Sequence, residues 1–141
     1  MKIHLGNEIW NQAGAFSVRM AVFVVERGIA LQEEFDSVDE KKPNYIVIYD
    51  ENHPIATGRY SMKGGVIRPG RIAVLASQRK KGLGKVIVEE IEKIGKDAGC
   101  RQSLIHGEMT AVPFYEKIGY VQNSTRFIED GVECIKLIKD I

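Results

Sequence analysis

The fold is decided by the stretch RIAVLASQRKKGLGK, which runs from Arg71 to Lys85. Residues 71–75 are mostly apolar and predict a β-strand, and the polar residues after them predict a loop. A helix follows from about Gly82 to Ala98, because apolar residues recur there at helical spacing, and Gly99 is a typical residue at its end. The sequence therefore predicts a strand, a turn and a helix in direct succession.

The turn between this strand and this helix gathers positive charge where a helix normally disfavours it. Four cations flank two glycines within seven positions: Arg79, Lys80, Lys81, Gly82, Gly84 and Lys85. The first N–H groups of a helix are unpaired and form the positive end of its dipole, so cations here are unfavourable unless an anion joins them. Glycine also lets a phosphate approach the backbone closely. The pattern therefore predicts a phosphate or pyrophosphate site.

Two common nucleotide-binding motifs do not fit this turn. A Walker P-loop would need glycine in place of Arg79, and the dinucleotide fingerprint would need glycine in place of Ile87. The residues between Glu51 and Glu89 include eight cations and no acid, whereas the whole chain has a net charge of +1. One compact cluster in a balanced chain favours a small anion over nucleic acid, with a small RNA-binding domain kept as an alternative.

The composition is that of an ordinary globular protein. A chain of 141 residues, 44% hydrophobic and 28% charged, predicts one domain over residues 1–141. The absence of a long apolar run and of a secretory leader predicts a cytoplasmic protein without a membrane partner. Cys100 and Cys134 lack metal-ligand spacing, so we expect two buried thiols and neither a metal site nor a disulfide.

The rest of the chain supplies strands and helices around this unit. The predicted elements are, in order, a strand over 2–5, a helix over about 8–25 capped by Asn7, an irregular acidic segment over 27–43, strands over 45–50, 55–63 and 66–68, a strand over 103–106, a helix over 110–118 capped by Thr110, and a hairpin of 127–129 with 132–138. This order predicts an α+β, or mixed α/β, domain with one sheet covered by helices.

Several segments of the chain resemble one enzyme family. Residues Arg79–Gly84 resemble the (Arg/Gln)-x-x-Gly-x-(Gly/Ala) signature of the GNAT family of N-acetyltransferases, and Ile72–Val74 is the strand that precedes it there. Residues Ala111–Tyr120 resemble the family segment Ala-x-x-x-Tyr-x-x-x-Gly-(Phe/Tyr). Residues Arg19–Glu26 together with Gln32–Glu34 are similar to the small bacterial members of the ElaA type. The resemblance covers essentially the whole chain and implies a central mixed, mostly antiparallel sheet flanked by helices.

The resemblance implies acetyl-CoA as the co-substrate and assigns residues to it. Backbone amides of one turn would hold the coenzyme A pyrophosphate: Arg79, Lys80, Lys81, Gly82, Leu83, Gly84 and Lys85. The edge of the strand Ile72, Ala73 and Val74 would pair with the pantetheine arm, and the Val74 amide would polarise the thioester carbonyl. Tyr115 matches the position that protonates the departing thiolate, although a core aromatic is the other interpretation of it.

One position departs from the family pattern. Where many relatives carry Asn, seven residues before the tyrosine, this chain has Glu108, whose ionised carboxylate could not donate a hydrogen bond. Either Glu108 turns toward the substrate amine, for which it could be the base, or that contact to the coenzyme is missing. The sequence leaves both interpretations open.

The acceptor is expected to be a small-molecule or protein amine. Direct transfer needs a neutral amine, and four carboxylates are candidates for taking its proton: Glu26, Glu33, Glu34 and Asp36. An acidic rim of this kind would favour a cationic amine. Three alternatives are kept: an acyl-homoserine-lactone-synthase-like enzyme, a non-catalytic acyl-CoA-binding module, and the RNA-binding domain. The oligomeric state, with a homodimer among the options, is left open.

Overall fold

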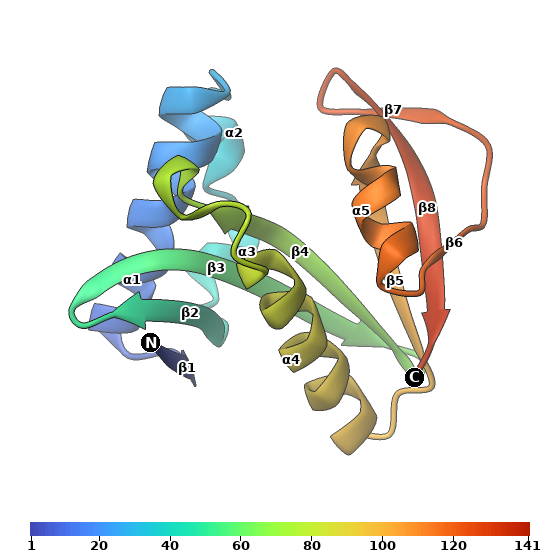
Figure 1. The fold of residues 1–141 in the computed structure, drawn as a ribbon, viewed down its shortest axis with the longest axis horizontal. Helices are drawn as coiled ribbons and strands as arrows, with labels where there is room; N and C mark the ends of the chain where they lie inside the picture. Colours follow the sequence, from blue (N-terminus) through green and yellow to red (C-terminus); the bar gives the residue numbers. More distant parts are fainter. The chain divides into compact units, whose positions relative to one another are not determined.

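The computed structural model describes residues 1–141, which fall into two compact units. The first unit contains Met1–Arg59 and Arg71–Val88, and the second contains Tyr60–Gly70 and Glu89–Ile141. Two strands and one helix begin in one unit and end in the other (Figure 1): β3 (His53–Lys63), β4 (Val66–Val74) and α4 (Leu83–Asp97). The expectation of one domain over 1–141 stays a prediction.

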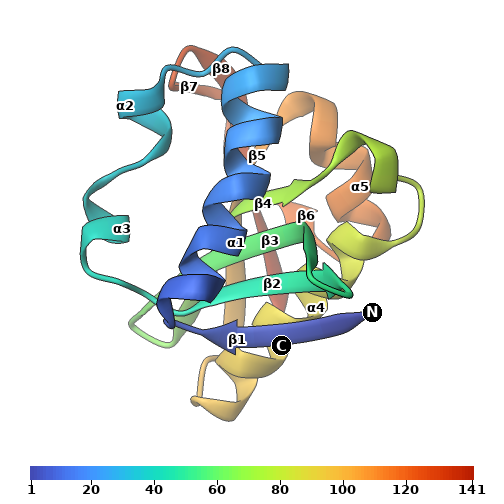
Figure 2. The ribbon, with the colours of Figure 1, turned by 90° about the vertical axis from the view of Figure 1, so that its left-hand side faces the viewer.

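The first unit is a sheet covered by a long helix. Its strand order is β1 (Lys2–Gly6), β2 (Tyr45–Asp50), β3 and β4, with β1 antiparallel to β2 and β2 antiparallel to β3. Figure 2 shows α1 (Ile9–Arg19) lying across β1, β2 and β3. Successive side chains of a strand point to opposite faces, so Tyr45 and Val47 pack with Ala15 of α1, while Ile46 and Ile48 are buried on the other face.

The predicted first helix is present, but it is not an α-helix throughout. Residues Met20–Glu26 continue α1 as a π-helix, η1. The predicted cap at Asn7 is wrong. Helix α1 begins one residue later, because the first intrahelical hydrogen bond runs from the Gln12 N–H to the carbonyl of Glu8, and Glu8 caps it without a side-chain hydrogen bond.

The acidic segment forms two single turns of helix, α2 (Leu31–Glu34) and α3 (Ser37–Glu40). Asp36 and Asp39 build a capping box at α3: each carboxylate accepts a backbone N–H from the residue of the other. The segment was expected to be a loop or irregular helix, and the structure agrees with that expectation.

Further along the first unit, the predicted strands over 66–68 and 71–75 are one strand, β4. The chain passes the Pro69–Gly70 pair without leaving the strand, and Arg71 adopts a left-handed φ of 49°. A short 3-10 turn, η2 (Ala76–Gln78), then leads toward α4. The side chains of Ile87 and Val88 have no solvent exposure, so the first turns of α4 are anchored in a core.

The second unit is built on the long strand β8 (Val132–Asp140). It pairs antiparallel with β5 (Gln102–Glu108) over the whole length of β5, and also with β6 (Val121–Gln122) and β7 (Phe127–Glu129). Strand β4 pairs parallel with β5 through Val66 and Ile67. The predicted hairpin is confirmed.

One short helix accompanies these strands. Figure 1 shows α5 (Val112–Lys117) beside β5 and β8, and a 3-10 turn, η3 (Met109–Ala111), comes before it. The predicted cap at Thr110 is wrong, since Thr110 lies inside η3 and Ala111 takes the cap position without a side-chain hydrogen bond. Pro113 stands in the first turn of α5, where its missing N–H costs no hydrogen bond.

Candidate functional site

The turn before α4 has the backbone geometry of an anion cradle. Lys80 and Gly82 adopt left-handed φ angles of 66° and 77°, and they reverse the chain after η2. The carbonyl of Gly82 accepts the N–H of Val86 at 3.1 Å, so the helix begins with Leu83. The N–H groups of the first turn after Gly82 therefore have no partner within the helix, and no acidic residue lies in that turn.

A buried leucine holds this turn in place, and its three lysines are exposed to solvent. Leu83 is buried and anchors the start of α4. Lys80, Lys81 and Lys85 are exposed, and only Lys81 makes a side-chain hydrogen bond, to Gln78 at 3.0 Å. The turn thus presents unpaired amides and exposed positive charge together, which is the arrangement that favours an oxyanion such as a phosphate.

The strand that leads into this turn offers a backbone edge. The N–H of Leu75 is bonded to the carbonyl of Ile55 in β3 at 3.0 Å. Since successive residues of a strand direct their N–H and C=O groups to opposite edges, those of Val74 point away from β3. Ala73 is buried in a cluster with Val22 and Phe23, whereas Ile72 and Val74 are half-buried.

Arg79, the first residue of the turn's signature, is bound by the protein itself. Its Nε donates to the carbonyl of Val74 at 3.1 Å, and its two terminal nitrogens donate to the two carboxylate oxygens of Glu26 at 2.6 Å each. The hydrogen bond from Arg79 holds the pKa of Glu26 below its ordinary value. The sequence predicted both residues for the site, but not that they pair with each other.

Arginines from other elements pair with the carboxylates of the acidic segment, so these carboxylates do not form the expected acidic rim. The guanidinium of Arg19 is 1% exposed and donates to the carboxylates of Glu34 and Asp39 and to the Glu34 carbonyl, at distances of 2.7–2.9 Å. Glu34 is also 1% exposed. Burial alone would raise the pKa of Asp39, but hydrogen bonds from Arg19, the Asp36 backbone and the Tyr45 hydroxyl hold it well below its ordinary value.

Two further arginines complete this network. Arg59 donates to Asp36 at 2.8 Å and to Asp39 at 2.9 Å, and Arg71 lies 3.5 Å from both Glu34 and Asp36. Asp36 and Glu34 are therefore engaged by arginines and do not face a cleft as free carboxylates. Of the four predicted acceptor-side residues, Glu33 alone is exposed and makes no ion pair, since the exposed Glu26 pairs with Arg79.

In the second unit, Tyr115 lies half-buried on α5 with its ring against other aromatics. The ring centroids of Phe114 and Tyr120 lie 5.1 Å and 5.9 Å away, and the ring borders Gly107 of β5. Burial, and secondarily the charge of Glu108, raises the pKa of Tyr115 to about 12. Tyr115 is therefore protonated at neutral pH.

The hydroxyl of Tyr115 differs from those of its buried neighbours, because it makes no hydrogen bond. The hydroxyl of Tyr120 donates to Glu92 at 2.8 Å and shares a 2.7 Å hydrogen bond with Ser103. In the first unit, the Tyr45 hydroxyl donates to a carboxylate and the Tyr49 hydroxyl to an amide oxygen. Tyr115 thus keeps a donor available in a partly dry environment.

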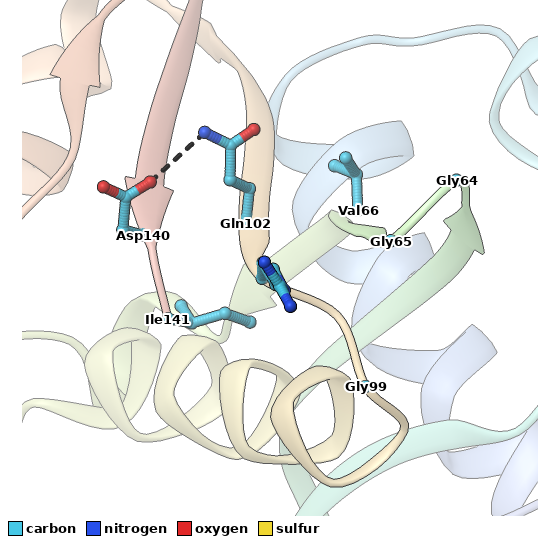
Figure 3. Close-up of a pocket in the computed structure, with 8 residues that line it drawn as sticks. Gly64, Gly65, Val66, Gly99, Gln102, Asp140 and Ile141 are labelled. Atoms are coloured by element: carbon cyan, nitrogen blue, oxygen red, sulfur yellow. Dashed lines mark hydrogen bonds between the residues drawn. The ribbon is translucent and has the colours of Figure 1, made fainter.

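A hollow of about 770 Å³ lies in the second unit, and none of the residues that line it is a predicted site residue (Figure 3). Its walls are turn glycines together with the end of the chain, and Gln102 and Asp140 are joined by a 3.2 Å hydrogen bond there. It contains no buried charged group and adds nothing to the site. No three His, Cys, Asp or Glu side chains are placed to hold a metal ion, and no helix has the length and apolar character that a membrane crossing requires.

Comparison with known proteins identifies the class to which this geometry belongs. Residues 15–141 match the family of the acetyltransferase (GNAT) domain. A crystal structure from Lactobacillus plantarum, assigned as an N-acetyltransferase, is 35% identical to this chain and superposes on it with a TM-score of 0.94. The match covers 99% of this chain and 97% of the Lactobacillus plantarum chain. The chain therefore belongs to the GNAT acetyltransferase family.

Two more distant structures share the fold. Escherichia coli ElaA is 17% identical with 98% of each chain covered and a TM-score of 0.83. The PaiA N-acetyltransferase of Thermoplasma acidophilum, solved in complex with coenzyme A, is 18% identical with 100% of each chain covered and a TM-score of 0.71. The family resemblance, the likeness to ElaA and the predicted mixed α/β fold with an open, mostly antiparallel sheet flanked by helices are confirmed.

Proposed function

We propose that this protein transfers an acetyl group from acetyl-CoA to a primary amine in one direct step. The observation that carries the proposal is the turn before α4, where unpaired backbone amides, two left-handed residues and exposed lysines stand at the end of a strand with a free amide edge. Family membership and the coenzyme A complex of a protein with the same fold support acetyl-CoA as the donor.

Each part of the coenzyme has a matching element in the proposal. The amides from Arg79 to Lys85 bind the pyrophosphate, with Lys80, Lys81 and Lys85 adding positive charge. The edge of Ile72–Val74 pairs with the pantetheine arm, as an added strand would. The N–H of Val74 donates to the thioester carbonyl and stabilises the oxyanion that forms when the amine attacks.

The chemical step moves one acyl group and two protons. The amine nitrogen forms a bond to the carbonyl carbon, and the bond from that carbon to sulfur breaks. Tyr115 donates its phenolic proton to the departing thiolate; its raised pKa keeps the phenol protonated at neutral pH, and its hydroxyl has no hydrogen-bond partner within the protein. The nitrogen loses its proton to a carboxylate or a water molecule, and Glu33 and Glu108 are the candidates, because the predicted alternatives Glu34 and Asp36 are bound by arginines.

The test is release of free thiol from acetyl-CoA in the presence of a panel of amines. The panel includes polyamines, aminosugars, lysine peptides and neutral or acidic amines, because the internal pairing of the acidic segment gives no preference for a cationic acceptor. We expect turnover with at least one class. Coenzyme A binding without turnover across the panel would favour the non-catalytic acyl-CoA-binding module.

Tyr115→Phe tests the assigned acid, and Tyr60→Phe is the matched control, since Tyr60 also lies half-buried but in β3 and outside the proposed site. We expect Tyr115→Phe to lower kcat about 100-fold or more with little change in the KM for acetyl-CoA. The control should stay within about twofold of the parent. Equal activity of the two variants would remove Tyr115 from the mechanism.

A further inference from the structure

The guanidinium of Arg79 is engaged on two sides by the protein itself. A guanidinium carries five N–H donors in a planar fork, and the two outer nitrogens here meet both oxygens of the Glu26 carboxylate at 2.6 Å. A third N–H, that of Nε, is directed at the carbonyl of Val74 at 3.1 Å, so the protein engages three of the five donors. A phosphate that bound the same two nitrogens in the bidentate way of Glu26 would have to displace that carboxylate.

The partners of Arg79 are the two elements that meet beneath the turn. Glu26 is the last residue of η1, and the inner residues Val22 and Phe23 of that helix pack against Ala73 of β4. Val74 is the last residue of β4 and carries the amide proposed to polarise the thioester. An apolar contact therefore joins η1 to the end of β4, and the hydrogen bonds of Arg79 connect both elements to the start of the turn.

The π-helical winding of η1 contributes to this arrangement. The N–H of Arg27 is bonded to the carbonyl of Val22, five residues earlier, at 3.1 Å. A π turn contains one residue more than an α turn, so the end of the helix faces a different direction from that of an α-helix of the same length. In this structure the residue that faces Arg79 is Glu26.

From these contacts we propose that Glu26 and Arg79 are positioning residues, which hold the Val74 carbonyl and the coenzyme-binding turn in place. The guanidinium of Arg79 does not contact the pyrophosphate. The carboxylate of Glu26 does not take the acceptor's proton. This inference rests on the proposed function for its binding site. It replaces the sequence-based expectation that Glu26 belongs to the acceptor side.

The competing interpretation makes the opposite prediction. If Arg79 were a phosphate ligand that Glu26 restrains in the free protein, Glu26→Gln would release the guanidinium and strengthen coenzyme A binding. If the pair positions the turn, the same change loosens it and weakens binding. An exposed ion pair is worth little to global stability, so the variant should stay folded under either interpretation.

The experiment is calorimetric titration of coenzyme A into four proteins: the parent, Glu26→Gln, Arg79→Gln and the control Glu40→Gln. Glu40 is an exposed acid of α3, and its change removes the same charge away from the turn. We expect Glu26→Gln to weaken binding about twofold to fivefold and the control to leave it unchanged. Tighter binding in Glu26→Gln would overturn the proposal.

Salt dependence and the free protein supply two independent readouts. Arg79→Gln should weaken binding without changing its dependence on ionic strength, because no charge contact to phosphate is lost; a flatter dependence would assign Arg79 as a ligand. NMR spectra of the free protein should show the backbone signals of Val74 and residues 79–85 shifted in Glu26→Gln but not in Glu40→Gln, and unchanged signals would refute the positioning role. If the parent does not bind coenzyme A, the proposed function fails, while the NMR comparison still decides whether the pair holds the turn.

Discussion

Replacing Arg19 by Met should destabilise the protein severely and reverse the pH dependence of its stability. Met retains an unbranched apolar side chain between the rings of Phe16 and Phe35, whose centroids lie 5.3 Å and 5.0 Å from the guanidinium carbon. The change removes the charge that compensates Glu34 and Asp39, which are 1% and 6% exposed. Two carboxylates would then remain buried with too little positive charge around them.

The magnitude follows from what remains in the network. Breaking a buried ion pair by removing one partner costs about 3–5 kcal/mol, because the other charge is left uncompensated. Arg59 still donates to Asp39 at 2.9 Å, and Arg71 lies 3.5 Å from Glu34, so both carboxylates keep one cationic neighbour. We therefore expect a loss near the lower end, about 3 kcal/mol, out of a total that is typically about 5–15 kcal/mol.

The sign of the pH dependence provides the sharper test. In the parent, Asp39 has a pKa below its ordinary value of 3.8, so its stabilising contribution is present above pH 3.8 and is lost as the pH falls below it. Without Arg19 burial dominates and raises the pKa of Asp39, so the folded variant binds protons more readily than the unfolded chain. The variant should therefore gain stability relative to the parent as the pH falls from 7 toward 4.

Urea unfolding followed by circular dichroism, at several pH values between 4 and 7, measures both effects. Arg19→Met combined with Glu34→Gln and Asp39→Asn should recover part of the loss, because the triple variant buries no uncompensated charge. A loss below about 1 kcal/mol in the single variant, with the same pH dependence as the parent, would refute the buried network as a source of stability.

Two further predictions concern the turn and the second unit. Gly82→Ala should lower the free energy of unfolding by about 1–2 kcal/mol and weaken coenzyme A binding in calorimetry. The reason is the left-handed φ of 77° at Gly82, since the space around this residue is open. Unchanged binding would show that the turn tolerates another backbone conformation. Tyr120→Phe should lower the free energy of unfolding in urea by about 1–2 kcal/mol, because Ser103 loses its 2.7 Å partner and Glu92 keeps only Lys139; no loss would mean that water replaces the hydroxyl.

The sequence predicted much of the fold because its strongest signals are local. The strand, turn and helix around Arg71–Lys85, the long first helix and the Asp130–Gly131 hairpin are all present, since periodicity and turn residues act over a few positions. Sequence reasoning missed the π-helical winding of Met20–Glu26 and the continuity of β4 through Pro69, and it predicted two side-chain caps that the structure lacks. Those features depend on competition between alternatives of similar local energy, which packing decides.

The candidate site was likewise predictable in part from the sequence. The residue types of the turn and the position of Tyr115 were readable, because helix starts and glycines have characteristic patterns. The partners of the charged residues were not, since Arg19, Arg59 and Arg71 meet their carboxylates from a helix and two strands. No spacing along the chain indicates which arginine reaches which acid.

By itself, the sequence determined that positive charge and glycine stand at the start of a helix after a strand, and hence that backbone amides are open to an anion there. Only the tertiary structure decided which charges remain available to a ligand. Arginines pair with the buried carboxylates of Glu34 and Asp39, and Glu26 binds Arg79, which is 53 positions away in the chain. An ion pair requires two groups a few ångströms apart, and only the packing of the helices and strands brings residues so distant in sequence that close.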